Sequence, residues 1–445
     1  MILDFNSIYQ KKSSFKPYRE EGKVLETKGM VYKVSLSTAT QGSRVTFLNE
    51  DGSKYFGEVV SISSDSCFVM PYQDVLGVNS RTKVFSNHHS NEVSVCHELL
   101  GRVVDAFGKP IDGKGPIKSN YAINKSLIGE QINPLERPPI DESLNFGIRA
   151  IDSFVTVGKG QRMSILAGSG IGKSVLLGMM AKNSSAQVNV IGLVGERGRE
   201  VREFIENDLG PEGLARSVIV VATSDTSPLV RMKAAYTATT IAEFFRDEKK
   251  DVLLMMDSVT RFAMAAREIS LSAGDPPGQK GYTPSVFARL PKLLERAGKV
   301  QGKGSITGIY TVLVEGGDMD EPITDAIRAI SDGHIQLSRE LAARNHYPAI
   351  DILSSISRVM NKVVSREHRI VASHLRDLLS AYRETEDLIN VGAYAKGTNP
   401  RVDKALKIYE ELIGFLKQSQ DEEEFLDLNS VFERLIELAR KAETN

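Results

Sequence analysis

The middle of the chain alternates between short apolar runs and stretches with a helical pattern of apolar residues. The apolar runs, typical of buried strands, lie at residues 163–167, 188–194, 218–222, 252–256 and 306–314, and the helical patterns include residues 174–182 and 229–246. Strands that alternate with helices predict right-handed βαβ units and a mostly parallel α/β sheet. Such sheets bind ligands at the carboxyl ends of their strands, so polar residues that follow a strand are candidate functional residues.

The flanking sections have other patterns. Short β-rich runs separated by Gly, Asn, Asp and Ser predict a small β-barrel or sandwich between residues 21 and 95; they lie at 28–34, 44–48, 55–62 and 67–70. Residues 99–117 are rich in turn residues and predict a connector. From about residue 365 strand-like runs disappear. Apolar residues then recur every three or four positions, which predicts amphipathic helices: Ala405, Leu406, Ile408, Tyr409, Leu412, Ile413, Leu416, then Val431, Leu435, Leu438 and Ala439.

The first 20 residues form a separate segment with two interpretations. Apolar residues at near-helical spacing precede four basic ones: Ile2, Leu3, Phe5, Ile8, Tyr9, then Lys11, Lys12, Lys16 and Arg19. One interpretation is a frayed terminus. The other is a short amphipathic segment that binds a partner or a membrane surface.

Composition and charge exclude several classes of protein. With 445 residues, 41% hydrophobic and 25% charged, the chain has a globular composition and is long enough for several domains. The 56 basic and 57 acidic side chains give a net charge of -1, which argues against a protein that coats nucleic acid. Cys67 and Cys96 are too few for a disulfide framework. Because no signal peptide and no apolar run of about 18 residues is present, we expect a cytoplasmic protein whose membrane contact is peripheral at most.

The strongest motif is the sequence AGSGIGKS at residues 167–174, which follows a predicted strand and opens a predicted helix. Gly168, Gly170 and Gly172 allow backbone N–H groups to point inward at phosphates. Lys173 supplies a positive charge for the β- and γ-phosphates, and Ser174 supplies a hydroxyl for Mg²⁺. The strict motif begins with Gly, where this chain has Ala167. The motif therefore predicts a P-loop that binds a nucleoside triphosphate.

Two further strand ends carry carboxylates suited to phosphate chemistry. Asp257 ends the run VLLMMD and matches the Walker B aspartate that holds Mg²⁺. Arg261 follows one helical turn later and is either a γ-phosphate contact or part of a structural ion pair. Glu196 follows another strand and is placed to orient the attacking water. Its alternative interpretation is a loop ion pair with Arg197 or Arg199.

At this point several segments together resemble a known family. The segments are GLVGERGREVREFIEN, MMDSVTRFAMAAREI, GDPPGQKGYTPSVFARLPKLLERAG, ISDGHIQLSRELAARNHYPAIDILSSISRVM, VGAYAKGTNP and the P-loop. They resemble the flagellum-specific export ATPases, which belong with the type III secretion ATPases and are related to the catalytic β subunit of rotary ATP synthases. The resemblance runs from about residue 96 to 415. It implies a RecA-like P-loop domain at 96–365, preceded by a β-barrel at 21–95 and followed by a helical domain at 366–445.

The resemblance also implies a role for individual residues. Glu196 matches the catalytic glutamate, and Glu200 matches an acidic residue that organises metal-bound water. Ser174 and Asp257 match the Mg²⁺ ligands, and Arg261 lies near the γ-phosphate. The residues that match the nucleotide-binding positions are Ala167, Gly168, Ser169, Gly170, Ile171, Gly172, Lys173, Ser174, Val175 and Tyr347, the last of which stacks on adenine. Arg358 matches an arginine finger given to the adjacent subunit, and residues 274–284 match a loop facing a central pore.

The resemblance implies an ATPase that uses ATP and Mg²⁺ and assembles as a homohexameric ring to energise flagellar protein export. The partners it implies are a regulator or stator protein at residues 1–20, a coiled-coil central stalk, a membrane export gate, and export chaperones and substrates. It implies no nucleic-acid partner and a peripheral position on the inner face of the cell membrane at the flagellar base.

Four alternatives stay open at this point. A non-catalytic nucleotide-binding subunit would lack the carboxylate that Glu196 provides. A hexameric nucleic-acid motor would need a nucleic-acid-binding N-terminal domain, which the charge and scattered aromatics do not indicate. A rotary synthase catalytic subunit is disfavoured because this one chain has both the catalytic and the finger residue. An injectisome ATPase differs little, and only VGAYAKG leans towards the flagellar group.

Overall fold

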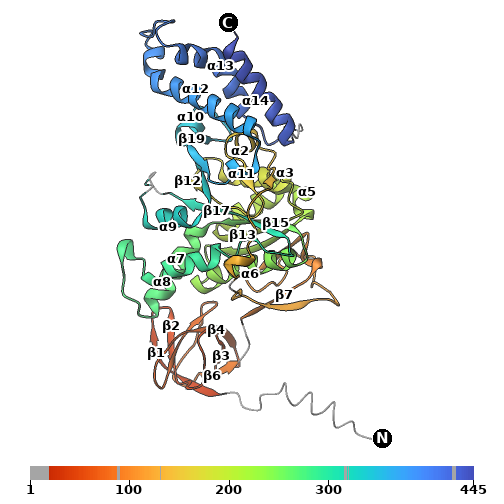
Figure 1. The fold of residues 1–445 in the computed structure, drawn as a ribbon. Coiled ribbons are helices and arrows are strands. Elements are labelled where there is room, and N and C mark those ends of the chain that lie inside the picture. The colour runs from red at the N-terminus through yellow and green to blue at the C-terminus, as the bar shows by residue number, and fades with distance from the viewer. Residues whose placement is uncertain are drawn as a thin grey trace.

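The computed structural model describes residues 20–87, 91–130, 132–314, 318, 320–422 and 427–444. The chain forms an elongated molecule with a β-barrel at one end, an α/β sheet in the middle and helices at the other end (Figure 1). All but residue 20 of the predicted N-terminal binding segment lies outside the described residues.

The barrel confirms the prediction from the short β-rich runs. Six strands close in the order β1-β2-β5-β4-β3-β6. Their bounds are β1 Glu21–Lys28, β2 Val31–Val34, β3 Arg44–Leu48, β4 Lys54–Ile62, β5 Cys67–Pro71 and β6 Lys83–Asn87. The predicted strand at 28–34 is wrong in its extent, because Gly29 has a φ of 57° and turns the chain between β1 and β2. Glycine adopts this left-handed conformation without the steric cost of a Cβ.

The central sheet confirms the predicted parallel α/β architecture. Its order is β19-β18-β12-β17-β15-β13-β14-β8, with β16 paired to β17. Neighbouring strands from β18 to β8 run parallel, whereas β19 runs antiparallel to β18. The bounds are β8 Arg102–Asp105, β12 Arg162–Ala167, β13 Val188–Glu196, β14 Ser217–Thr223, β15 Asp251–Asp257, β16 Gly298–Lys299, β17 Ser305–Leu313, β18 Gly333–Leu337 and β19 Ile350–Ser357.

Strand β8 corrects the prediction of a connector at 99–117. Arg102–Asp105 pairs with β14 and forms the edge of the central sheet. Two smaller sheets complete the β-structure, β7 Glu92–Val95 with β9 Ile123–Ser126 and β10 Ser143–Leu144 with β11 Val157–Gly158.

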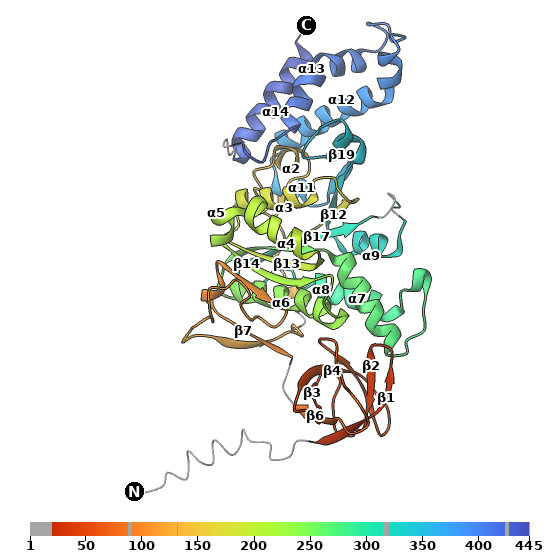
Figure 2. The same cartoon turned by 180° about the vertical axis from the view of Figure 1, so that it is seen from behind.

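Helices cover both faces of the central sheet (Figure 2). One apolar cluster joins one sheet face, including Val190 and Leu254, to α6 and α7; the other joins the opposite face, including Ile191 and Leu253, to α3 and the C-terminal helices. Neighbouring residues such as Val190 and Ile191 face opposite sides of the sheet because side chains alternate along a strand. The helices of this part are α2 Arg149–Phe154, α3 Lys173–Asn183, α4 Gly198–Glu203, α5 Gly210–Ala215, α6 Pro228–Asp247, α7 Val259–Ser272, α8 Pro284–Leu294, α9 Pro322–Ile330, α10 Arg339–Ala343 and α11 Met360–Val363.

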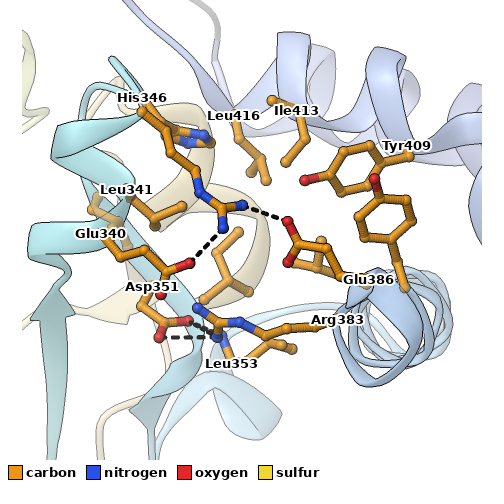
Figure 3. A pocket seen from close by; sticks show the side chains of 15 residues that line it. Glu340, Leu341, His346, Asp351, Leu353, Arg383, Glu386, Tyr409, Ile413 and Leu416 are labelled. Carbon is orange, nitrogen blue, oxygen red and sulfur yellow. Dashed lines mark hydrogen bonds and ion pairs between the residues drawn. The ribbon is translucent and has the colours of Figure 1, made fainter. Parts of the chain in front are cut away.

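The C-terminal part is helical, as the apolar spacing predicts. Its helices are α12 Arg366–Asn390, α13 Pro400–Leu416 and α14 Leu428–Glu443. Tyr382 of α12 stacks on Tyr409 of α13 with ring centroids 3.5 Å apart. A pocket separates these helices from α10 and β19, and ion pairs cross it (Figure 3). Arg383 lies 3.1 Å from Asp351 at one side of the pocket.

Two expectations about the whole chain can also be compared with the structure. Cys67 and Cys96 are buried free cysteines, as predicted from their number. Within the described ranges, the search for a helix both apolar and long enough to cross a bilayer finds none.

Candidate active site

The P-loop lies between β12 and α3, where the sequence predicts it. Ala167 is the last residue of β12, and α3 begins at Lys173. Gly170 and Gly172 have φ values of 75° and 84°, so the loop needs glycine at both positions. Ile171 is buried and holds the loop against the core, whereas Ser169, Ser174 and Val175 are exposed. The backbone N–H groups of residues 168–174 are therefore available to phosphate oxygens at a helix N-terminus.

Three charged side chains meet at the carboxyl ends of three parallel strands, with β17 lying between β12 and β15. Lys173 follows β12, Asp257 ends β15 and Glu196 ends β13. The Lys173 ammonium forms an ion pair with Asp257 and lies 3.6 Å from Glu196 Oε1. Thr311 of β17 donates a hydrogen bond of 2.7 Å to Asp257 and fixes its carboxylate. The structure thus brings together the predicted phosphate-binding lysine and both predicted carboxylates.

Glu196 has the environment of a group that accepts a proton or orients water. Burial raises the pKa of its carboxyl to about 7; Asp257 and a hydrogen bond with Glu200 add to the rise, and Lys173 opposes it. Glu196 Oε1 is buried and has no hydrogen-bond partner. A buried polar atom without a partner is costly, so the site fits a further hydrogen-bond donor such as a water molecule. The sequence alternative for Glu196, a loop ion pair with Arg197 or Arg199, does not occur, because Arg197 contacts Glu200 and Arg199 contacts Glu203.

Arg261 reaches the same place from α7. A Cβ on Gly195 would lie 2.9 Å from Arg261 Cβ, so the arginine packs directly against the backbone beside Glu196. Gly195 has a φ of 76°, a second reason for glycine there. Arg261 Nε is buried without a hydrogen-bond partner. Among the described residues no ion pair of Arg261 within 4.0 Å is found, so the role of Arg261 at the γ-phosphate stays a prediction.

Tyr347 lies against the other end of the P-loop. Its ring atoms are 3.3 Å from the position that a Cβ on Gly172 would take, and 42% of the residue is exposed. The backbone N–H of Gln418 donates to the Tyr347 carbonyl over 2.9 Å, and the Gln418 side chain bonds to Arg149 and Gly147. The partly exposed Tyr347 therefore lies beside the start of α3, and its stacking on a base stays a prediction.

Arg358 lies apart from this group. It follows β19, whose last residue Ser357 pairs with Gly333 at the start of β18. Because β18 runs parallel to β12, Arg358 lies level with the start of β12, whereas the P-loop follows its end. The six residues of β12 span roughly 20 Å. That separation is too large for Arg358 to reach the P-loop of its own chain.

The loop at 274–284 also lies away from the P-loop. Residues 276–280 are exposed, and Tyr282 anchors the end of the loop with Arg267 4.9 Å above its ring. It projects between α7 and α8, near the barrel end of the sheet (Figure 1).

The donor set fits a magnesium-bound nucleotide. Ser174 and Asp257 offer a hydroxyl and a carboxylate oxygen, the hard ligands that Mg²⁺ prefers. Throughout the described parts of the chain no group of three His, Cys, Asp or Glu residues could hold a metal. Mg²⁺ commonly binds through one or two carboxylates plus substrate phosphates, and Asp257 offers one such carboxylate at the P-loop lysine.

Three residues near the site were not predicted from the sequence. Thr311 orients Asp257, Gln418 holds the Tyr347 segment, and Arg339 lies over Gly168 of the P-loop. Thr311 carries a weak signal, since it lies in a strand-like run beside the P-loop strand. Gln418 and Arg339 belong to segments whose proximity depends on tertiary packing.

Comparisons with known proteins agree with this geometry. Residues 147–357 match the model of the ATP synthase alpha/beta family, nucleotide-binding domain, and residues 364–437 match that of the T3SS EscN ATPase C-terminal domain. The flagellum-specific ATP synthase of Bacillus subtilis (strain 168) is 50% identical over 412 residues, covering 92% of this chain and 93% of the relative. The type 3 secretion system ATPase of Xanthomonas euvesicatoria is 46% identical over 405 residues and 91% of each chain.

Solved structures give the same result. The assembled ATPase EscN of the enteropathogenic E. coli type III secretion system matches with a TM-score of 0.86 and 43% identity over 94% of this chain and 100% of that one. EscN in complex with its central stalk EscO matches with a TM-score of 0.85 and 44% identity, over the same shares of both chains. The chain therefore belongs to the family of flagellum-specific ATP synthases and type III secretion ATPases, within the ATP synthase alpha/beta nucleotide-binding proteins.

Proposed function

We propose that the chain hydrolyses ATP at the interface between two copies of itself, within a homohexameric ring, and that this activity energises flagellar protein export. The observation that carries the proposal is that the predicted catalytic residues and the predicted arginine finger lie at opposite ends of the parallel strands. Glu196, Lys173 and Asp257 meet at the carboxyl edge, whereas Arg358 is exposed at the opposite edge. One chain in a ring can then supply both halves of a shared site.

The chemistry follows from the side chains at the carboxyl edge. The P-loop N–H groups and Lys173 bind the β- and γ-phosphates, and Tyr347 stacks on adenine. Glu196 accepts a hydrogen bond from water and orients it for in-line attack on the γ-phosphorus. Lys173, Arg261 and the partner's arginine neutralise the charge that develops on the phosphoryl oxygens. Ser174 and Asp257 would hold Mg²⁺, and Glu200 would organise its water; the ion would supply further neutralisation of the phosphate charge.

The flagellar pathway rests on similarity. Relatives called flagellum-specific ATP synthases come from Bacillus subtilis and Salmonella typhimurium, at 50% and 48% identity. The type 3 secretion system ATPase of Xanthomonas euvesicatoria is only slightly less similar at 46%, so we propose secretion by an injectisome as the second candidate. Restoring motility in a strain that lacks its flagellar ATPase supports the flagellar pathway; restoring only injectisome secretion in a matching strain supports the second.

The partners that we propose also rest on similarity to known relatives. EscN binds its central stalk EscO, which supports a coiled-coil stalk partner for this chain. We further propose a regulator or stator protein at residues 1–20, contact with a membrane export gate, export chaperones and substrates, and a peripheral position on the inner membrane face at the flagellar base.

The test is phosphate release as a function of protein concentration, with sedimentation in the same samples. Activity per chain should rise as the ring forms. Arg358→Ala should keep nucleotide affinity within about 2-fold and lose the assembly-dependent turnover, because an arginine finger contributes roughly 10³–10⁵ in rate. Glu196→Gln should also keep affinity and lose turnover by roughly 10²–10⁴. Activity that is independent of concentration, or unchanged in Arg358→Ala at saturating protein, would contradict the shared site.

A further inference from the structure

Arg339 reaches the P-loop through the pairing of two strands. β18 pairs in parallel with β12, with Leu166 opposite Gln336 near the end of both strands. Ser338 then caps α10, and Arg339 is its first residue. Arg339 therefore lies at the carboxyl ends of the strands, where the P-loop begins.

The guanidinium of Arg339 lies directly against the P-loop backbone. A Cβ on Gly168 would be 2.8 Å from Arg339 Nε, 3.0 Å from Nη2 and 3.3 Å from Cζ. Unlike Gly170 and Gly172, Gly168 does not have a left-handed φ. Glycine is therefore needed at this position for the close approach of Arg339 and not for the turn itself.

Among the residues that the structure describes, no acidic side chain forms an ion pair with Arg339. Arg344, at the other end of α10, lies 2.8 Å from Glu340 and 2.6 Å from Glu386. No hydrogen bond or ion pair is found for the exposed Arg339 side chain among the residues that the structure describes. Within the described part of the chain, the N–H donors and the positive charge of Arg339 therefore lie unpaired beside the start of the P-loop.

We propose that Arg339 is a positioning residue of the nucleotide site, which braces the first turn of the P-loop at Gly168 and favours polyphosphate ligands through its charge. The proposal rests on the proposed function, since it assigns a role within that nucleotide site. It acts through the loop and not on the reacting atoms, so the expected effect is on affinity and KM and not on kcat.

The first measurement is the dissociation constant of Mg-ATP and of AMP, which does not require hydrolysis. One guanidinium at roughly 10 Å from several phosphate charges corresponds to about a 3- to 10-fold change in affinity. Arg339→Gln should weaken Mg-ATP binding by that factor, raise KM in parallel, and change AMP binding by less than about 2-fold. Arg339→Lys should restore most of the preference for ATP over AMP.

The second measurement is a double-mutant cycle with Gly168→Ala. The new methyl group displaces the guanidinium, which is the flexible end of its side chain, so Gly168→Ala alone should resemble Arg339→Gln. In the Arg339→Gln background, adding Gly168→Ala should weaken Mg-ATP binding by less than about a further 2-fold. Independent, multiplicative effects would show that the two residues do not act together.

Arg366→Gln is the matched control, because Arg366 is also an exposed arginine that opens a helix after a serine cap, at α12. It should leave both affinities unchanged. The inference is overturned if Arg339→Gln behaves like this control, if kcat falls while KM stays constant, or if Arg339→Lys behaves like Arg339→Gln. Wild-type protein that binds Mg-ATP without hydrolysing it would refute the proposed function and leave this inference testable.

Discussion

The barrel is fastened to the central sheet by a buried ion pair whose removal has a calculable cost. Lys233 of α6 lies 3.2 Å from Glu58 of β4, with side chains only 7% and 10% exposed. Tyr72 donates to Glu58 over 2.9 Å and Asn91 over 3.2 Å, while the Lys233 ammonium also contacts Asn91. Burial lowers the pKa of Lys233, and Glu58 opposes that shift. The barrel and α6 therefore share one desolvated polar cluster.

Replacing Lys233 with methionine leaves the buried Glu58 without its ion-pair partner. Breaking a buried pair in this way costs about 3–5 kcal/mol. Because the Tyr72 and Asn91 donors remain, we expect the lower end, about 3 kcal/mol in the free energy of unfolding. Lys233→Met with Glu58→Gln removes both charges and keeps an acceptor for Tyr72, so the double variant should lie within about 1.5 kcal/mol of the wild type.

Urea unfolding followed by circular dichroism measures these differences, since the chain has no tryptophan for fluorescence. Lys362→Met, at an exposed lysine, is the control and should change stability by less than about 0.5 kcal/mol. A cost below about 1 kcal/mol for Lys233→Met, or a double variant less stable than Lys233→Met alone, would refute the view that an uncompensated carboxylate causes the loss.

Two further predictions concern single residues. Burial raises the pKa of Asp152 to about 7, above its unfolded value near 4, so its contribution to stability is present at low pH and disappears as pH rises from 4 through 7. Stability curves against pH should show Asp152→Asn gaining relative to the wild type by up to about 4 kcal/mol between pH 4 and 8; parallel curves would contradict this. Gly195→Ala should lose about 1–2 kcal/mol of stability and, because it displaces Arg261, most turnover. Gly397→Ala, with a φ of 95° and open space around it, should lose similar stability but keep turnover in a phosphate-release assay.

Local patterns were sufficient to predict the core of the site. Lys173, Asp257 and Glu196 each lie at or just after the end of a strand-like run, and parallel pairing places such ends at the same side of the sheet. The order β12-β17-β15-β13 then brings these three close together. Arg339 and Gln418 could not be found this way. Their contacts with the P-loop segment depend on β18 pairing with β12 and on α13 ending beside Tyr347, which are long-range events.

The fold was predictable to a similar extent. The alternation of strands and helices indicates the parallel sheet and its faces. Strand β8 was missed because four residues surrounded by turn residues carry little pattern, and only pairing with β14 makes them a strand. The turn at Gly29 was missed because the apolar and β-branched residues continue on both sides of it.

Arg358 and the P-loop lie at opposite ends of the parallel strands, so each chain has two different surfaces through which it would contact its neighbours. If the arginine serves a neighbour, a two-fold symmetric pair cannot complete both sites through one shared patch, since the patch would have to contain both edges. Association is then head to tail, and any open row of subunits leaves the nucleotide site of one terminal subunit without its arginine. Only closure into a ring completes every nucleotide site. A single subunit that lacks both its arginine and its catalytic residues would therefore impair the site of its neighbour as well as its own.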